Sequence, residues 1–347
     1  MEQNSASILL IYTGGTIGMK QDPETLALAP FNFSQITGEV PELKKFGCQI
    51  DTISFDPLID SSDADIPFWQ KLVSVIEKEY CKYDGFVILH GTDTMSYTAS
   101  ALSFMLQNLE KPVILTGSQL PIGVLRTDGK ENLISSIEIA AARDKEGHPM
   151  VPEVCIFFES QLYRGNRTTK YSAENFRAFR SASYHVLAEA GIHIKYYRDY
   201  INYPDEWGKP LRVESSLDPN VAILKIFPGI SKSIVDSIID TKGLRAIVLE
   251  TFGSGNAPTK EWFIKSIKRA VDMEIIVLNI TQCHAGYVDM NAYTAGVELK
   301  KAGVLSGYDS TTEAAVTKLF FLLSQNIDYK IITRNIDKNI SGEITKH

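Results

Sequence analysis

Short apolar runs alternate with longer amphipathic stretches along most of this chain, and this alternation restricts the possible folds more than any other feature. Apolar runs without polar alternation are typical of strands that are buried on both faces of a parallel sheet. The stretches between them repeat apolar residues every three or four positions, as amphipathic helices do. We therefore predict an α/β fold with largely parallel sheets and flanking helices. The predicted strands cover residues 8–11, 86–89, 113–115, 154–158, 222–226, 246–249 and 275–280.

The helical period is clearest over residues 68–80 and 95–109. Residues 195–220 break the pattern, because prolines and aromatic residues stand there among charged residues without a sustained period. The chain has 347 residues, which is enough for roughly two domains. We predict that residues 195–220 connect them as a semi-rigid strap on the surface, since the segment is not rich in Gly and Ser. The predicted domains are an N-terminal catalytic α/β domain over residues 1–194 and a C-terminal α/β domain over residues 221–347.

The charge balance limits the classes of ligand. With 35 Lys and Arg against 42 Asp and Glu, the formal net charge is −7, which argues against nucleic acid and against an anionic membrane surface as partners. The N-terminus lacks the basic and apolar regions of a secretion signal, and no run approaches the ~18 apolar residues of a membrane span. We therefore expect a cytoplasmic protein whose ligand is small and uncharged or zwitterionic.

Cysteine usage gives no sign of a metal or redox centre. The cysteines lie far apart and form no C-x-x-C motif, which disfavours a zinc ribbon and a redox pair. Reduced thiols are the expected state. The cysteines are Cys48, Cys81, Cys155 and Cys283.

Two threonines occupy glycine-rich turns directly after predicted strands. Thr16 lies in YTGGTIG and Thr92 in LHGTDTM. A hydroxyl held by such a turn is exposed, immobile and close to backbone N–H donors, which suits a nucleophile in acyl transfer. Local structure explains each turn alone, Thr16 as a turn residue and Thr92 with Asp93 as a helix N-cap. The matched turns favour catalysis, because ligands of parallel sheets bind at the carboxyl ends of the strands, and TGSQ follows a third strand.

Other chemistries lack their sequence signatures. The glycines of TGGTIG do not have the spacing of G-x-G-x-x-G, and no lysine follows them as in a P-loop, so a nucleotide-dependent enzyme is disfavoured. The chain has neither G-x-S-x-G nor H-E-x-x-H, and its histidines are scattered. A two-lobed binding protein of the periplasmic type would need an export signal and no clustered threonines. We interpret His90 and His284, which stand beside glycine-bearing turns, as supporting residues and not as bases.

A hydroxyl nucleophile without histidine needs a lysine or a carboxylate as its base. Lys170 in LYRGNRTTK is the candidate, although a solvated basic loop explains this segment equally well. The sequence leaves the protonation state of Lys170 open, and it does not decide which threonine attacks first.

The motifs together resemble a known family. YTGGTIG and GFVILHGTDTM resemble the two defining motifs of the bacterial-type L-asparaginases, and DSSD, TGSQ, LYRGNRTTK, GNAP and NITQC follow in the order of the cytoplasmic type I branch. The likeness covers essentially the whole chain. It implies hydrolysis of L-asparagine to L-aspartate and ammonia, with slower action on glutamine, and no metal or organic cofactor. It also implies a larger N-terminal domain with a mostly parallel sheet, a smaller Rossmann-like C-terminal α/β domain, and assembly as a homodimer or homotetramer.

The resemblance assigns roles to matched residues. Thr16 corresponds to the nucleophile of the first attack, with Thr92, Asp93 and Lys170 as the supporting triad. DSSD corresponds to the loop that holds the α-carboxylate and α-ammonium groups of the substrate. A zwitterion needs an anionic partner for its ammonium and N–H or hydroxyl donors for its carboxylate, and fixing both ends places the amide against the nucleophile. The implied substrate-binding residues are Asp60, Ser61, Ser62, Thr92, Asp93 and Ser118.

Two positions depart from the family pattern. Residues 19–33 contain no tyrosine, and Leu28 stands near the place of the loop tyrosine that supports the threonine. Glu250 stands before the GSGNAP turn, where enzymes with a regulatory asparagine pocket have an arginine. Because a carboxylate repels the effector's carboxylate, we predict no allosteric activation, although Thr169 and Cys283 match positions of that pocket.

Overall fold

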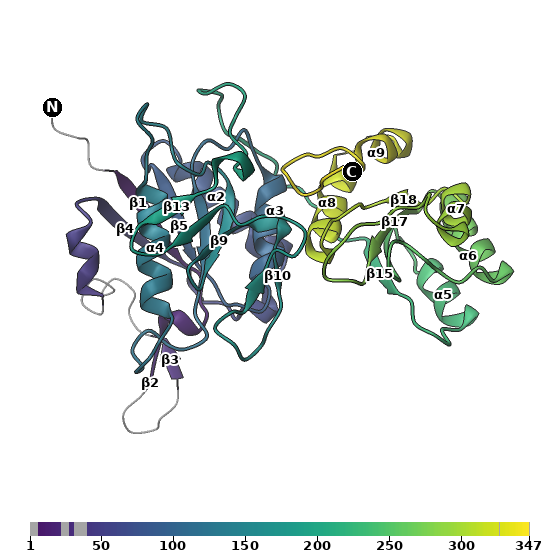
Figure 1. The fold of residues 1–347 in the computed structure, drawn as a ribbon, viewed down its shortest axis with the longest axis horizontal. Helices are drawn as coiled ribbons and strands as arrows, with labels where there is room; N and C mark the ends of the chain where they lie inside the picture. The colour runs from purple at the N-terminus through teal and green to yellow at the C-terminus, as the bar shows by residue number, and fades with distance from the viewer. Residues whose placement is uncertain (1–5, 22–27, 31–39, 326, 347) are drawn as a thin grey trace. The chain divides into compact units, whose positions relative to one another are not determined.

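The computed structural model describes residues 6–21, 28–30, 40–325 and 327–346, and its chain divides into two compact units (Figure 1). The N-terminal unit comprises Met1–Ser181 and His185–Ser215. The C-terminal unit comprises Ala182–Tyr184 and Ser216–His347. The main boundary therefore falls inside the 195–220 segment.

The N-terminal unit is built on an eight-stranded sheet with the order β13-β12-β9-β8-β7-β5-β1-β4. The strands from β4 to β8 in this order are parallel, and β8, β9, β12 and β13 pair antiparallel. Five of the eight strands therefore have the predicted parallel arrangement, and β9, β12 and β13 extend the sheet with antiparallel pairs. The strands are β1 (Ser7–Tyr12), β4 (Gln49–Ser54), β5 (Gly85–Leu89), β7 (Val113–Thr116), β8 (Val154–Phe158), β9 (Gln161–Arg164), β12 (Ala188–Ala190) and β13 (Ile194–Tyr196).

Burial explains which strands were predictable. Strands β5, β7 and β8 are buried at every position, so their sequences are continuous apolar runs. Strand β4 lies at the edge and none of its residues is fully buried, so its sequence QIDTIS lacks such a run. Helices α3 (Met95–Met105) and α4 (Gly129–Ala141) pack on the central strands, and α2 (Ile66–Glu79) packs on α3.

Helix α3 ends earlier than its sequence period predicts. The apolar spacing extends to residue 109, but the helix ends at Met105 and the chain continues as β6 (Leu106–Gln107). Strand β6 pairs antiparallel with β14 (Arg212–Val213). Hydrogen bonds to a distant segment therefore replace the next helical turn at this point, and periodicity alone carries no sign of that competition.

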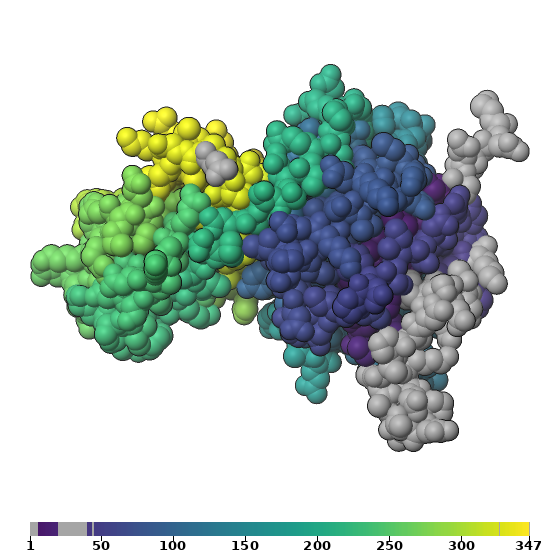
Figure 2. Space-filling model, turned by 180° about the vertical axis from the view of Figure 1, so that it is seen from behind, coloured from purple at the N-terminus to yellow at the C-terminus, as the bar shows by residue number. Residues whose placement is uncertain are grey.

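Residues 198–215 lie along the surface of the N-terminal unit (Figure 2). Lys209 N–H donates to Oε1 of Glu110, and the Gln70 side chain donates to the carbonyl oxygen of Ser215.

Among the described residues, no helix is long and apolar enough to cross a membrane. The short elements of this unit are β2 (Met19–Gln21), β3 (Leu28–Pro30), β10 (Thr169–Lys170), β11 (Phe179–Arg180), η1 (Thr16–Gly18), η3 (Pro41–Lys45), η4 (Ser61–Asp63), η5 (Gly165–Arg167) and η6 (Arg198–Tyr200).

The C-terminal unit contains a four-stranded parallel sheet with the order β15-β16-β17-β18. In its core, apolar side chains of the strands pack together with side chains of the amphipathic helix α6, such as Phe263 and Ile267. The smaller α/β domain of the prediction is thereby confirmed. The elements are β15 (Val221–Lys225), β16 (Ala246–Thr251), β17 (Ile276–Thr281), β18 (Leu305–Ser306), α5 (Lys232–Ile239), α6 (Glu261–Asp272), α7 (Thr294–Lys301), α8 (Thr312–Ser324) and α9 (Tyr329–Asn335).

Candidate active site

The two glycine–threonine turns touch each other at the carboxyl ends of neighbouring parallel strands, β1 and β5. Gly15 has φ +88°, and a Cβ atom added there would lie 2.6 Å from the backbone nitrogen of Gly91. At Gly14, with φ +134°, an added Cβ would lie 2.1 Å from the carbonyl oxygen of Ile59. Only glycine permits both the left-handed backbone and this approach. The sequence TGGT therefore brings the turn of Thr16 against that of Thr92.

A third segment, residues 55–60, is joined to the end of β1 by backbone hydrogen bonds. Phe55 N–H donates to the Tyr12 carbonyl at 2.8 Å, and Ile59 N–H donates to the Thr13 carbonyl at 2.9 Å. The segment ends at Asp60, whose side chain caps the short helix η4. These contacts place the DSSD loop beside the two turns.

A cavity of about 210 Å³ opens where these segments meet. Its size is suited to a ligand smaller than a typical drug-sized molecule. Hydroxyl, carboxylate and backbone groups gather in its wall. The described residues that line it are Tyr12, Gly14, Gly15, Thr16, Met19, Leu58, Ile59, Asp60, Ser61, Gly91, Thr92 and Asp93.

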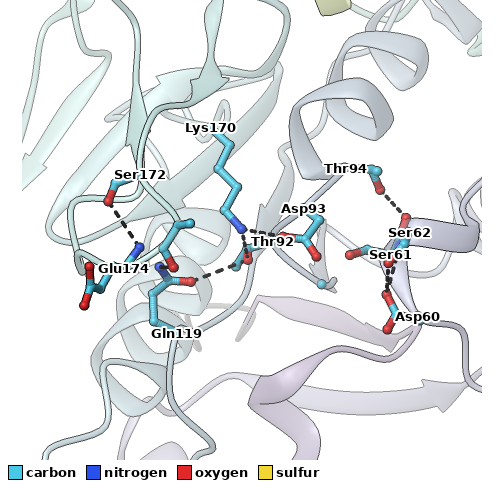
Figure 3. Close-up of polar contacts among 12 residues, drawn as sticks. Asp60, Ser61, Ser62, Thr92, Asp93, Thr94, Gln119, Lys170, Ser172 and Glu174 are labelled. Carbon is cyan, nitrogen blue, oxygen red and sulfur yellow. Dashed lines mark hydrogen bonds and ion pairs between the residues drawn. The ribbon is translucent and has the colours of Figure 1, made fainter.

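Lys170 joins two of the cavity residues (Figure 3). Its Nζ lies 2.9 Å from Oγ1 of Thr92 and 2.5 Å from Oδ1 of Asp93. The lysine side chain is only 18% exposed, whereas that of Asp93 is 64% exposed. Lys170 donates in both contacts. It therefore directs positive charge at the Thr92 oxygen while Asp93 balances that charge from the solvent side.

Gln119 belongs to the same group, although our sequence reasoning did not select it. Its Oε1 lies 3.5 Å from Oγ1 of Thr92, a long contact at the limit of a hydrogen bond. Its amide nitrogen donates to the carbonyl oxygens of Ala173 and Asn175 at 3.3 and 3.1 Å. Gln119 thus links Thr92 to the loop after Lys170 (Figure 3). The only sequence signal was its place in TGSQ after a strand.

The Asp60 carboxylate is held ready as an anion at the cavity wall. Its Oδ1 accepts hydrogen bonds from the Ser62 hydroxyl at 2.6 Å and from the Ser62 N–H at 2.9 Å. These bonds, the hydroxyl first, lower the pKa of Asp60 below its usual value. The loop is tied down further because Oγ1 of Thr94 donates to the Ser61 carbonyl at 2.6 Å (Figure 3).

Two predicted substrate ligands are absent from the described lining of the cavity. The Ser62 hydroxyl is used by Asp60, as above. Ser118 is only 2% exposed, and its hydroxyl donates to the Leu120 carbonyl at 2.6 Å. Neither serine is among the described residues that line the cavity, and each hydroxyl makes a hydrogen bond to a neighbour. The other predicted residues either line the cavity or, in the case of Lys170, contact residues that do.

His90 precedes the second turn and is fully buried. Its Nδ1 lies 2.6 Å from the Gly91 carbonyl oxygen, and its Nε2 lies 2.9 Å from Oγ1 of Thr98. Burial lowers the pKa of His90 to about 4, so the ring is neutral near pH 7. This arrangement agrees with a supporting role and not with that of a base that faces the substrate.

The departures from the family pattern are partly visible. Residues 22–27 and 31–33 of the 19–33 segment lie outside the described residues. The prediction about the missing loop tyrosine falls on this segment. Glu250 is 7% exposed. Its carboxylate accepts from the Thr312 hydroxyl at 2.7 Å and lies 3.2 Å from Nζ of Lys225.

Within the described parts of the chain, no cluster of His, Cys, Asp or Glu is arranged to hold a metal ion.

An α/β fold with a small cavity at the carboxyl ends of parallel strands, lined by hydroxyl and carboxylate groups, is typical of a protein that binds a small polar ligand. The chain belongs to the asparaginase family. Residues 7–202 match the family model described as Asparaginase, N-terminal, and residues 220–335 match the Glutaminase/Asparaginase C-terminal domain.

Individual relatives agree over the full chain. L-asparaginase 1 of Escherichia coli K12 is 42% identical over 341 residues, which cover 98% of each chain. The crystal structure of L-asparaginase I from Vibrio cholerae superposes with a TM-score of 0.89 at 39% identity and covers 99% of this chain and 100% of that one. The 60 kDa lysophospholipase of Mus musculus is 38% identical over 97% of this chain and 62% of that protein.

Proposed function

We propose that this chain hydrolyses the side-chain carboxamide of L-asparagine to L-aspartate and ammonia, with minor action on glutamine. The observation that carries the proposal is the cavity that Thr16, Thr92, Asp93 and Asp60 line together. Its volume of about 210 Å³ suits an amino acid and leaves little room for a lipid chain. The 42% identity to an L-asparaginase supports the same substrate.

The proposed binding mode holds the substrate by both charged ends. The carboxylates of Asp60 and Asp93 bind the α-ammonium group, and the Ser61 hydroxyl with nearby N–H groups binds the α-carboxylate. Ser62 keeps Asp60 ionised and oriented through its two hydrogen bonds. We assign Ser118 no direct contact with substrate, because its hydroxyl is used by Leu120. With both ends fixed, the side-chain amide is presented to the threonines.

In the first half of the proposed reaction, Oγ1 of Thr16 attacks the amide carbon. A C–O bond forms, the carbonyl oxygen becomes an oxyanion, and N–H donors near Thr92 stabilise it. The C–N bond then breaks as the nitrogen takes up a proton, which balances the proton lost by the Thr16 hydroxyl, and leaves as ammonia. The product is an ester between the aspartyl group and Thr16.

In the second half, water attacks this ester, which releases L-aspartate and restores the Thr16 hydroxyl. Thr92, Lys170 and Asp93 form the proton-handling group, since Nζ of Lys170 contacts both other members. In its ammonium form, Lys170 has to release a proton before it can accept one. We place Thr16 first and Thr92 in support because of the family resemblance.

We further propose that residues 1–194 form the catalytic domain and residues 221–347 the C-terminal α/β domain, with residues 195–220 between them. The cavity residues all fall in the first of these, which supports the division.

The proposed form is a cytoplasmic homodimer or homotetramer without a cofactor. Multi-angle light scattering of the purified protein measures the oligomeric state directly.

Ammonia release tests the proposed activity. The purified full chain is incubated with L-asparagine in the presence of a chelator and without nucleotide, and both ammonia and L-aspartate are quantified. Equimolar release is expected, together with a slower reaction on L-glutamine. A folded protein that releases neither product, or that requires ATP or a divalent metal, would refute the proposal. A parallel incubation with a lysophospholipid is expected to give no fatty acid.

A further inference from the structure

Three buried side chains form a chain of hydrogen bonds that ends on the turn of Thr92. The indole Nε1 of Trp69 in α2 lies 3.0 Å from Oγ1 of Thr98 in α3. That oxygen lies 2.9 Å from Nε2 of His90, and Nδ1 of His90 lies 2.6 Å from the Gly91 carbonyl oxygen. We call Trp69, Thr98 and His90 the buried relay. Its last acceptor belongs to the peptide bond that joins Gly91 to Thr92.

The chemistry of its two ends sets the direction of every bond in the relay. An indole N–H can only donate, and a carbonyl oxygen can only accept. The Gly91 carbonyl therefore requires the proton of His90 on Nδ1, which leaves Nε2 of the neutral ring as an acceptor. The Thr98 hydroxyl donates to Nε2 and accepts from the indole. The network thus assigns one tautomer to His90 without any conflict between donors.

The relay is shielded from water. Trp69 is 5% exposed, His90 1% and Thr98 0%, and the ring of Phe68 packs edge-on against the imidazole with centroids 5.5 Å apart. Hydrogen bonds in such surroundings are stronger than at the surface, and an unpaired group there is costly. The relay therefore holds the carbonyl of Gly91 firmly, at a residue that has no side chain to restrict its own rotation.

The held carbonyl has a consequence on the opposite side of the peptide. In a planar trans peptide, the C=O and the following N–H point in opposite directions. The Gly91 oxygen points toward the buried His90, so the N–H of Thr92 points away from His90. Both Gly91 and Thr92 line the cavity. Among the described residues, none accepts a hydrogen bond from this N–H.

We propose that His90 is a positioning residue, through which the buried relay presents the N–H of Thr92 to the oxyanion that develops on the substrate amide. The inference rests on the proposed amide hydrolysis. His90 transfers no proton to substrate in this role. His90 orients a backbone donor before the reaction begins. Its loss should therefore raise the energy of the transition state more than it weakens substrate binding.

Substitutions at Thr98 test the role because they leave the cavity residues unchanged. Thr98→Val keeps the shape but removes the hydroxyl, so the tautomer of His90 is no longer imposed. We expect kcat for L-asparagine to fall roughly 10- to 100-fold, while KM and the affinity for L-aspartate stay within about two-fold. Thr98→Ser restores the hydroxyl and is expected to restore most of kcat.

The matched control is Thr317→Val in the C-terminal unit, the same change at another threonine that is 0% exposed and whose hydroxyl donates to the carbonyl oxygens of Glu313 and Ala314 in its own helix. It is expected to lower thermal stability comparably and to leave kcat unchanged. Equal effects of both valine variants on kcat, or a parallel loss of kcat and aspartate affinity in Thr98→Val, would overturn the proposal. If Thr98→Val does not fold, Trp69→Phe removes the other end of the relay and is judged by the same kcat and affinity criteria.

A readout independent of turnover separates this inference from the proposed function. Nitrogen-15 spectra of the histidine rings at neutral pH are expected to show His90 as the Nδ1–H tautomer in the unmodified protein and as a mixture in Thr98→Val. An Nε2–H tautomer in the unmodified protein would contradict the proposed role of the buried relay, even if the enzyme hydrolyses asparagine. Conversely, absence of asparagine turnover in the unmodified protein refutes the proposed function and leaves the tautomer assignment standing.

Discussion

Nζ of Lys170 lies 2.9 Å from Oγ1 of Thr92, although the two residues are 78 positions apart. Thr92 follows the central strand β5, whereas Lys170 lies in the short hairpin of β10 and β11. The same ammonium group pairs with Asp93, next to Thr92 in sequence. A rigid sheet end and a separate hairpin thus meet at one hydroxyl, which makes the contribution of each side chain measurable by substitution.

Loss of either threonine hydroxyl should abolish efficient turnover. We expect Thr16→Ala and Thr92→Ala each to lower kcat for L-asparagine by at least about 10³-fold, because each removes a group proposed to react directly. Neither change creates a large buried cavity, so the thermal midpoint should move little. Steady-state ammonia release and thermal unfolding measure the two effects. Near-normal kcat in either variant would contradict the proposed mechanism.

Lys170→Met should remove the charge that faces the Thr92 oxygen. A decrease of roughly 10²- to 10⁴-fold in kcat is expected, in the range of general acid–base contributions. Lys195→Met is the control, because Lys195 is an exposed lysine of the same unit. Both variants are compared in the ammonia assay at several pH values. An unchanged kcat for Lys170→Met would exclude the lysine from the reaction.

Gly15→Ala should damage the site more than its backbone angle alone explains. Gly15 and Gly147 have nearly the same φ, +88° and +87°, but an added Cβ has nothing within 4 Å at Gly147 and lies 2.6 Å from the Gly91 nitrogen at Gly15. Gly147→Ala therefore gives a reference cost for a side chain at this φ in open space, about 1–2 kcal/mol. Gly15→Ala should cost more in urea unfolding and should also lower kcat. Equal costs for the two variants would show that the close contact between the turns is unimportant.

Acidification should destabilise the protein through His90. Its pKa falls from 6.5 to about 4 on folding, so the unfolded state binds more protons between these values. Stability is therefore complete above pH 6.5 and decreases as the pH falls toward 4, by up to about 3 kcal/mol for this group. Urea unfolding at pH 7 and pH 5 measures the change. The difference should shrink in His90→Gln, and an undiminished difference would assign the effect to other groups.

Substrate saturation should be hyperbolic. By the family resemblance, Glu250 stands where an effector-binding arginine is expected, and its carboxylate contacts Thr312 and Lys225. A second asparagine would meet negative charge there. Initial rates over a wide range of asparagine concentration test the prediction, with calorimetric titration to count sites in Thr16→Ala. Clear sigmoidicity together with a second bound asparagine would contradict it.

The sequence alone indicated the strand framework and the two turns that line the cavity. Strands β5, β7 and β8 are buried throughout and could be recognised as continuous apolar runs. Thr16 and Thr92 stand in glycine-rich turns whose conformation depends on neighbouring residues, so their exposure at strand ends was predictable. Local interactions dominate at these points, and local interactions are what a sequence pattern records.

Only the tertiary structure decided which groups meet and which face the cavity. The end of α3 at Met105 depends on pairing between β6 and β14, more than a hundred residues apart in the chain. Gln119 reaches Thr92, whereas Ser118, one residue earlier, turns its hydroxyl to Leu120. Adjacent residues in a loop point in different directions according to the backbone dihedrals, and those are set by packing against distant segments. Sequence order carries no direct record of that packing.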